Sequence, residues 1–273
     1  MDEGSTELDL VILTASAKKS KLGRDGDCVS GINLKNKQFV RLVSDKEGDS
    51  IIKGNLSYQG MKINFLDIIT VSGHYFPLEI QKENFVLRKI RNYSGRQASV
   101  EDILSYLPYV DNGNLLEDVE GNVSIEKAQK FAGSLMLIVA EDIKIYKICS
   151  NKSEENKKVK TKIDFIYDDN EYKEYYVTDR DYFSFSDECL NYKRALLVIS
   201  TSDKPYVDNR YYKFVAKIFP LSTELVDINI GEEVFSEHFG VGHIQSIDGE
   251  TITVKFTSGI KKICKDYLEK RLY

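Results

Sequence analysis

The chain has 273 residues, of which 42% are hydrophobic and 30% are charged, as is ordinary for a globular protein. The formal net charge of -5 excludes a strongly basic chain dedicated to nucleic acid, although a local basic groove stays compatible with that total. The 17 Tyr and 13 Phe, with no Trp, favour strands.

The four cysteines give no metal-ligand spacing. Cys28, Cys149, Cys189 and Cys264 form no C-x-x-C pair, and no histidine stands near them. We therefore expect no metal site and no cofactor. The acidic start MDEGSTELDL lacks the features of a signal peptide, and no apolar run approaches the roughly 18 residues of a membrane span. We expect a cytoplasmic protein without a membrane partner.

Runs rich in β-branched and aromatic residues predict strands in the first third of the chain. The candidates are residues 8–16, 28–34, 38–44, 65–76 and 84–90, with a polar hairpin turn at 35–37. A capping box at Ser99 then predicts a short helix, and residues 124–131 predict a second one.

The β pattern resumes at Ser134 and continues to about residue 221. VKTKIDFIY alternates apolar and polar positions, and Asp168-Asp169 marks a hairpin turn. A last series of strands starts near Ile230, where Asp248-Gly249 is a strong hairpin signal. The sequence thus predicts a mainly β protein with three β units, at roughly 8–95, 133–221 and 230–273.

The first two units share short motifs in a recognisable order. CVSGINL is followed by FVRLVS, FLDIITV and QKENF, and then by SLMLI, KIDFIY, YYVTD and YYKFVAKI. In this order the chain resembles the dual OB-containing domain family of prokaryotes over about residues 8–220. Phe39 and Leu42 depart from it, since Trp and Pro are common there. The resemblance implies OB-like barrels at 8–95 and 133–222, joined by a helical connector at 96–132.

The tail carries a second pattern, Gly-x-x-Val-x-x-x-x-Phe-Gly-x-Gly, on Gly231, Val234, Phe239, Gly240 and Gly242. Here residues 230–273 are similar to the Tudor/SH3-like barrel that ends UvrD/PcrA-type helicases. The resemblance implies a small barrel that docks RNA polymerase, a helicase-type protein or nucleic acid. No G-x-x-x-x-G-K-[ST] motif occurs, so no ATPase is implied.

OB barrels bind single strands by stacking bases on aromatic rings while Lys and Arg follow the backbone. Clusters that combine both chemistries give these candidate nucleic-acid-binding residues: Lys18, Lys19, Lys21, Arg24, Arg41, Arg88, Arg91, Tyr93, Arg96, Lys158, Lys160 and Tyr175. Solvation of a loop or an edge strand explains the lysines equally well. Arg41 lies among apolar neighbours, which favours a buried pair with Asp67 or Glu83 over ligand contact.

In the tail, Val234, Ile244, Val254 and Phe256 are predicted core residues. Gly240 and Gly242 are expected to supply a positive φ or a close backbone approach. The predicted protein-docking surface consists of Phe235, His238, Phe239, His243, Lys261 and Lys262.

No catalytic motif stands out, because G-x-S-x-G and H-E-x-x-H are absent and no Cys has a His partner in a motif context. We therefore expect a binding protein and not an enzyme. The leading hypothesis is a nucleic-acid-associated protein that holds DNA or RNA on its OB-like barrels. A protein-interaction adaptor is the alternative, and a nucleotide sensor or nuclease accessory protein is a third option.

Overall fold

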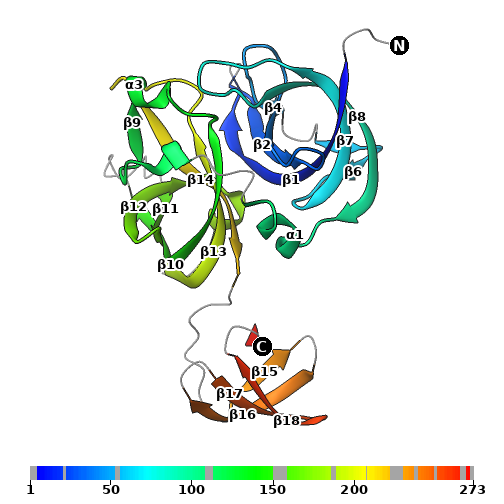
Figure 1. Ribbon diagram of the computed structural model, residues 1–273, viewed down its shortest axis with the longest axis vertical. Helices are drawn as coiled ribbons and strands as arrows, with labels where there is room; N and C mark the ends of the chain where they lie inside the picture. Colours follow the sequence, from blue (N-terminus) through cyan, green and yellow to red (C-terminus); the bar gives the residue numbers. More distant parts are fainter. Residues whose placement is uncertain are drawn as a thin grey trace.

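The protein is mainly β, as the sequence predicts, and in the part of the chain that the structure describes its strands form two six-stranded sheets, one five-stranded sheet and one two-stranded sheet (Figure 1). The computed structural model describes residues 5–20, 23–52, 56–107, 113–149, 159–185, 189–206, 208–221, 230–236, 239–248, 251–264 and 269–270.

The first large sheet closes into a barrel of five strands. They are β1 (Thr6–Lys19), β2 (Asp25–Asn33), β3 (Phe39–Val43), β7 (Asp67–Tyr75) and β8 (Asn84–Gln97), with the short β4 (Ile51–Ile52), β5 (Ser57–Tyr58) and β6 (Met61–Lys62) between β3 and β7. β1 pairs with both β2 and β7, and a parallel pairing of β3 with β8 completes the closure. This is the five-stranded barrel of an OB fold.

The second large sheet repeats this arrangement. Its strands are β10 (Leu135–Cys149), β11 (Val159–Tyr167), β12 (Asn170–Val177), β13 (Cys189–Thr201) and β14 (Arg210–Pro220). β10 lies between β11 and β13, and β12 pairs in parallel with β14. The predicted turn between β11 and β12 is confirmed, because Asp168 and Asp169 both have a positive φ, of 49° and 59°. The short 3₁₀ turn η3 (Arg180–Tyr182) follows β12.

The connector contains the two predicted helices. Ser99 caps α1 (Val100–Leu104) in a reciprocal capping box with Asp102, and Ser124 caps α3 (Ile125–Ala128). Between them lie η1 (Gly113–Leu116) and a strand that the sequence analysis missed, β9 (Asn122–Ser124). β9 pairs with the start of β14, so the end of the connector belongs to the second sheet.

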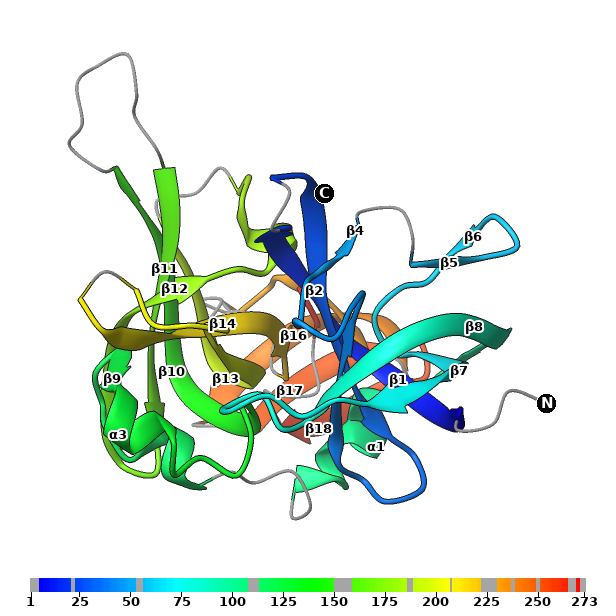
Figure 2. The ribbon, with the colours of Figure 1, turned by 90° about the horizontal axis from the view of Figure 1, so that it is seen from above.

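The two barrels pack side by side, as both views show (Figures 1 and 2). β1 turns Leu10 and Ile12 into its own barrel, whereas Val11 and Leu13 face outward and pack in one buried cluster with Leu135 of β10 and other residues of the second barrel. Burial on both faces explains why the β1 sequence is a continuous apolar run instead of an alternating one.

Polar contacts cross the same seam between the barrels. The Arg180 guanidinium lies 2.8 Å from the Asp27 carboxylate, and the Lys217 ammonium stands 3.8 Å from the centre of the Phe65 ring. The backbone N–H of Ala17 donates to the carbonyl of Thr178. Apolar packing and these contacts together join the two barrels into one block.

The third sheet contains β15 (Glu233–Ser236), β16 (Gly240–Asp248), β17 (Thr251–Phe256), β18 (Gly259–Cys264) and β19 (Glu269–Lys270), drawn orange to red in Figure 1. The strands follow one another in antiparallel order, and β19 pairs back with β15. The predicted core residues Val234, Ile244, Val254 and Phe256 are buried together with Ile252.

Both expected glycine roles in the tail are confirmed. Gly240 has a φ of +74°, and a Cβ on Gly242 would meet the Phe256 ring at 2.6 Å. Gly249, in the predicted hairpin turn between β16 and β17, lies outside the described residues.

Candidate nucleic-acid interface

OB folds bind oligonucleotides on the face of their second and third strands, flanked by the loop between strands 1 and 2 and the loop between strands 4 and 5. In the first barrel this face, on β2 and β3, is covered. Ile32 and Phe39 pack in the seam cluster, and the Arg41 guanidinium donates to Ser134 and Ser200 of the second barrel, at 2.7 and 3.2 Å. Packing of the barrels has turned this surface into an interface.

The buried pair predicted for Arg41 is present, with Glu83 as its partner. Arg41 is 3% exposed, and its Nε lies 3.2 Å from Oε1 of Glu83. Asp67, the other partner considered, accepts a hydrogen bond from Gln97 instead. The Arg41 guanidinium also contacts the Cys28 sulfur at 2.6 Å. Arg41 is therefore held by protein groups on several sides, below the surface.

In the second barrel the corresponding face is open. A groove of about 550 Å³ runs over β11, β12 and β14, a size within the range of ligand pockets. Its walls include Val159, Lys160, Tyr176, Phe183, Tyr206 and Tyr212. The loop between β13 and β14, which contributes Tyr206, is the loop between strands 4 and 5 of this barrel.

The rings in this groove are exposed to an unusual degree. Tyr206 is 54% and Phe183 43% exposed, although large apolar side chains are normally covered. The rings of Tyr206 and Tyr212 meet edge to face, with centroids 4.9 Å apart, and Tyr212 donates to Asp208 at 2.8 Å. Partial burial raises the pKa of Tyr206, so its phenol stays neutral. The groove thus presents aromatic rings that neighbouring side chains hold in place and that are still accessible to solvent.

Two lysines flank the ring of Tyr176. The ammonium of Lys162 lies 3.7 Å from the ring centre, and that of Lys160 lies 4.7 Å away. Lys162 is 6% exposed and donates to the carbonyl of Glu174, so it supports the strand from beneath the surface. Lys160 is exposed and lines the groove, which places one cation beside the aromatic wall. Lys158 lies outside the described residues.

Tyr175 was predicted to bind nucleic acid, and this prediction is wrong. Its side chain is fully buried in the barrel, and its hydroxyl donates to the carbonyl of Glu120 at 2.9 Å. The reason is a break in the strand alternation, because Glu174 has a φ of 57° and turns both Tyr172 and Tyr175 inward. Tyr176, the next residue, points outward instead. Burial raises the pKa of the Tyr175 phenol.

Phe183, Tyr206 and Tyr212 were not among the predicted site residues. The segment SDKPYVDNRYY carries Lys204, Tyr206, Arg210 and Tyr212 between two apolar strands. A basic and aromatic loop before the last strand of a barrel was the available signal. This signal can be interpreted only when the strand order is known, because the strand order places the loop beside β11 and β12.

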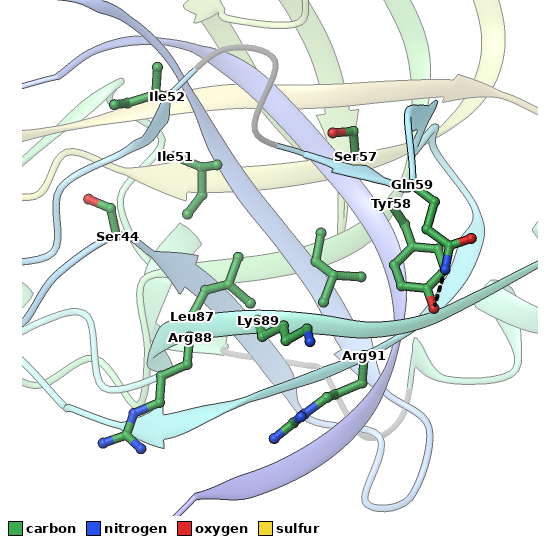
Figure 3. Close-up of a pocket in the computed structure, with 11 residues that line it drawn as sticks. Ser44, Ile51, Ile52, Ser57, Tyr58, Gln59, Leu87, Arg88, Lys89 and Arg91 are labelled. Carbon is green, nitrogen blue, oxygen red and sulfur yellow. Dashed lines mark hydrogen bonds between the residues drawn. The ribbon is translucent and has the colours of Figure 1, made fainter.

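The first barrel has a basic pocket of its own, of about 590 Å³, over β8 and the β5–β6 hairpin (Figure 3). It brings the predicted residues Arg88 and Arg91 together with Lys89. In Figure 3 both arginines extend from β8 on the side away from Ile51, and Tyr58 lies at one end of the pocket. Arg91 donates to Ser72 at 3.0 Å and lies 3.4 Å from Glu7.

Other predicted residues lie apart from both sites. Tyr93 and Arg96 follow on β8 beyond the pocket lining, and a hydrogen bond with Asp67 raises the pKa of Tyr93. Lys18 forms an ion pair with Asp203 of the second barrel at 3.2 Å, and Arg24 is exposed. Lys21 lies outside the described residues, as does the side chain of Lys19.

The structure describes the side chains of part of the predicted docking surface in the tail. Phe239 is 37% exposed and lies 5.4 Å from the Lys261 ammonium, and the adjacent Ile260 is 61% exposed. His243 and Lys262 are also exposed. His238 and the side chain of Phe235 lie outside the described residues.

A comparison with known protein families agrees with the presence of two OB-type barrels in this chain. Residues 8–218 match the family described as Dual OB-containing domain. The chain belongs to this family. The match covers both barrels and the connector of the dual OB domain but not the third sheet. No curated protein matches the chain.

The described part of the dual OB protein contains neither a metal-ligand cluster nor a membrane-spanning helix. Within the described ranges, no three His, Cys, Asp or Glu side chains come together as a metal site requires. No helix in the same part of the chain is long and apolar enough to cross a membrane.

Proposed function

We propose that the protein binds single-stranded nucleic acid in the groove over β11, β12 and β14, and acts as a binding protein without catalysis. The observation that carries the proposal is a set of aromatic rings beside Lys160, on the face that OB folds use: Phe183 and Tyr206 are exposed, and Tyr176 is half-buried. Stacked bases need π-faces, and the phosphate backbone needs a cation beside them.

Fluorescence anisotropy with labelled 12-nucleotide DNA and RNA strands tests this proposal. Tyr206→Ala should weaken binding by roughly 5- to 150-fold, the range expected for loss of one base–aromatic stack. Tyr75→Ala is the matched control, because Tyr75 is 42% exposed in the first barrel and lines no part of the groove. Wild-type affinity should fall steeply with salt. Equal binding by both variants, or no binding at low salt, would refute the proposal.

A second proposal concerns the tail, which we infer docks a protein such as RNA polymerase. Its support is the exposed pair Phe239 and Ile260 beside Lys261, since an apolar centre with a polar rim is typical of interfaces. Ile260→Asp in the full chain should abolish binding to purified RNA polymerase in an interferometry assay. Lys35→Asp, in the first barrel, is the control. If both variants bind as the wild type does, the tail does not dock through this surface.

A further inference from the structure

A third pocket lies between the two barrels. It has a volume of about 550 Å³ and is lined from the first barrel by residues that include Ser16, Cys28 and Gln81, and from the second barrel by the segment from Ser200 to Lys204. Because each barrel supplies one wall, the pocket exists only when the barrels pack as they do here.

The side chains that line this pocket differ in chemistry from those that line the groove over β11, β12 and β14, which is called the aromatic groove below. Hydroxyl and amide side chains dominate it, and Ser16, Gln81, Thr201 and Ser202 are each at most 8% exposed. The Thr201 hydroxyl has no hydrogen-bond partner among the described residues. Buried polar groups are normally paired, so a wall with a lone hydroxyl suits a polar ligand.

The charges on these walls largely cancel. Lys18 pairs with Asp203 at 3.2 Å, Arg41 pairs with Glu83 at 3.2 Å, and the lining also includes a further charge of each sign, on Lys204 and Asp49. A phosphate would have to compete with carboxylates for both of the paired cations. A neutral ligand with hydrogen-bonding edges meets no such competition, and a nucleobase has that chemistry.

The pocket adjoins the groove over β11, β12 and β14. Thr178, Tyr206 and Phe214 line both, so the ring of Tyr206 stands at the boundary between them. A strand stacked along the groove therefore reaches the pocket entrance at Tyr206, where a base can turn in while the backbone stays outside.

We propose that the pocket between the barrels receives one nucleobase of the strand held in the groove and gives the protein a base preference at that position. This inference rests on the proposed function. The base turns in beside Tyr206 and Phe214, and its polar edge meets the hydroxyl and amide side chains. Thr201 gains its missing partner by rotation about its Cα–Cβ bond.

Protection of Cys28 from iodoacetamide tests entry into the pocket. Cys28 is half-buried and lines the pocket, whereas Cys189 lies on β13 outside it and serves as the control thiol in the same chain. Peptide mass spectrometry should show that a saturating oligonucleotide slows alkylation of Cys28 several-fold and leaves Cys189 unchanged. Free nucleosides at the same base concentration form the second arm of the experiment.

The outcomes separate the two proposals. An oligonucleotide that binds without protecting Cys28 overturns the base pocket and leaves groove binding intact. No binding of any oligonucleotide overturns groove binding and the base pocket together. Protection by free nucleosides but not by a bound oligonucleotide overturns delivery of the base by the strand. Protection by the oligonucleotide supports it.

Base preference itself is tested with Thr201→Val, which keeps the side-chain shape and removes the lone hydroxyl. Because that hydroxyl has no partner, the melting temperature should not fall. Affinity for the preferred homopolymer should fall about tenfold, while affinity for the weaker homopolymers should stay unchanged. Thr70→Val, on β7 and outside both pockets, is the control. Unchanged preference in Thr201→Val overturns the role of that hydroxyl.

Discussion

Arg41 and Glu83 hold each other 3.2 Å apart, Nε to Oε1, and both also bond to Ser134 of the second barrel. Glu83 accepts from the backbone N–H of Ser134 at 3.1 Å, and Arg41 donates to its hydroxyl at 2.7 Å. An ion pair within one barrel thus becomes the polar centre of the joint between two barrels. The β3 strand, a ligand strand in other OB folds, here serves assembly.

Removal of one partner of this pair should be costly. Glu83→Gln leaves the buried Arg41 charge uncompensated and should lower the free energy of unfolding by about 3 kcal/mol. The double variant Arg41→Met/Glu83→Gln should recover part of that loss, because no charge stays buried. Urea unfolding followed by tyrosine fluorescence measures both. A single variant as stable as the wild type would contradict the structural role of the pair.

Lys213 should make stability depend on pH. It is 1% exposed, and burial lowers its pKa to about 8 from an ordinary 10.5. Between these values the unfolded chain binds more protons than the folded one, so stability should rise with pH across that window, by about 3 kcal/mol in total. Below pH 8 both states are protonated and the full penalty applies.

The substitution Lys213→Met isolates this effect. Urea midpoints at pH 7, 8, 9 and 10 should rise with pH more in the wild type than in the variant, and the variant should be the more stable protein at pH 7. Lys144→Met, an exposed position on β10, controls for loss of a positive charge. Parallel pH profiles of wild type and Lys213→Met would show that the Lys213 ammonium is not desolvated.

Gly242 should be essential for the stability of the third sheet and not for that of the two barrels. An added Cβ would lie 2.6 Å from the Phe256 ring and 2.7 Å from Val254, both buried core residues. Gly242→Ala should therefore unfold the tail at a lower temperature, by overpacking that costs roughly 1–3 kcal/mol. Proton NMR of the full chain should lose dispersed tail signals on mild heating and keep those of the barrels. Gly121→Ala, where the added Cβ would lie at an ordinary contact distance of 3.8 Å from the Tyr175 ring, is the comparison.

The basic pocket of the first barrel should matter only for long strands. Arg88→Glu/Lys89→Glu reverses two charges in that pocket and leaves the groove of the second barrel untouched. We expect unchanged binding of a strand of about 8 nucleotides, which one OB barrel accommodates. For a long strand, the slope of log affinity against log salt should shrink by about 0.7 for each phosphate that the variant no longer neutralises.

Lys130→Glu/Lys144→Glu reverses two exposed lysines outside both pockets and so controls for the same change in net charge. If Arg88→Glu/Lys89→Glu and the control weaken long-strand binding equally, the effect is one of total charge and not of the pocket.

Local pattern was sufficient for the long strands of the two barrels, the capped helices and the core of the tail. It also predicted a buried pair of Arg41 with Asp67 or Glu83, because an arginine with apolar neighbours needs a nearby carboxylate, and the structure shows Glu83 as the partner. It failed at Tyr175, because a left-handed residue at Glu174 breaks the period of two of the strand and turns this ring inward. It also missed Tyr206, whose importance depends on strands far away in the sequence.

Alternation, apolar runs and turn residues act between near neighbours along the chain, and they suffice to predict the two large β units. Which barrel keeps the outer face of its second and third strands open is decided by tertiary packing. Burial of Ile32 and Arg41 against the second barrel covers the β2–β3 surface, whereas Tyr176 and Tyr206 line a groove on the second barrel. That choice depends on contacts between residues more than 90 positions apart, such as Arg41 and Ser134, which no local pattern encodes.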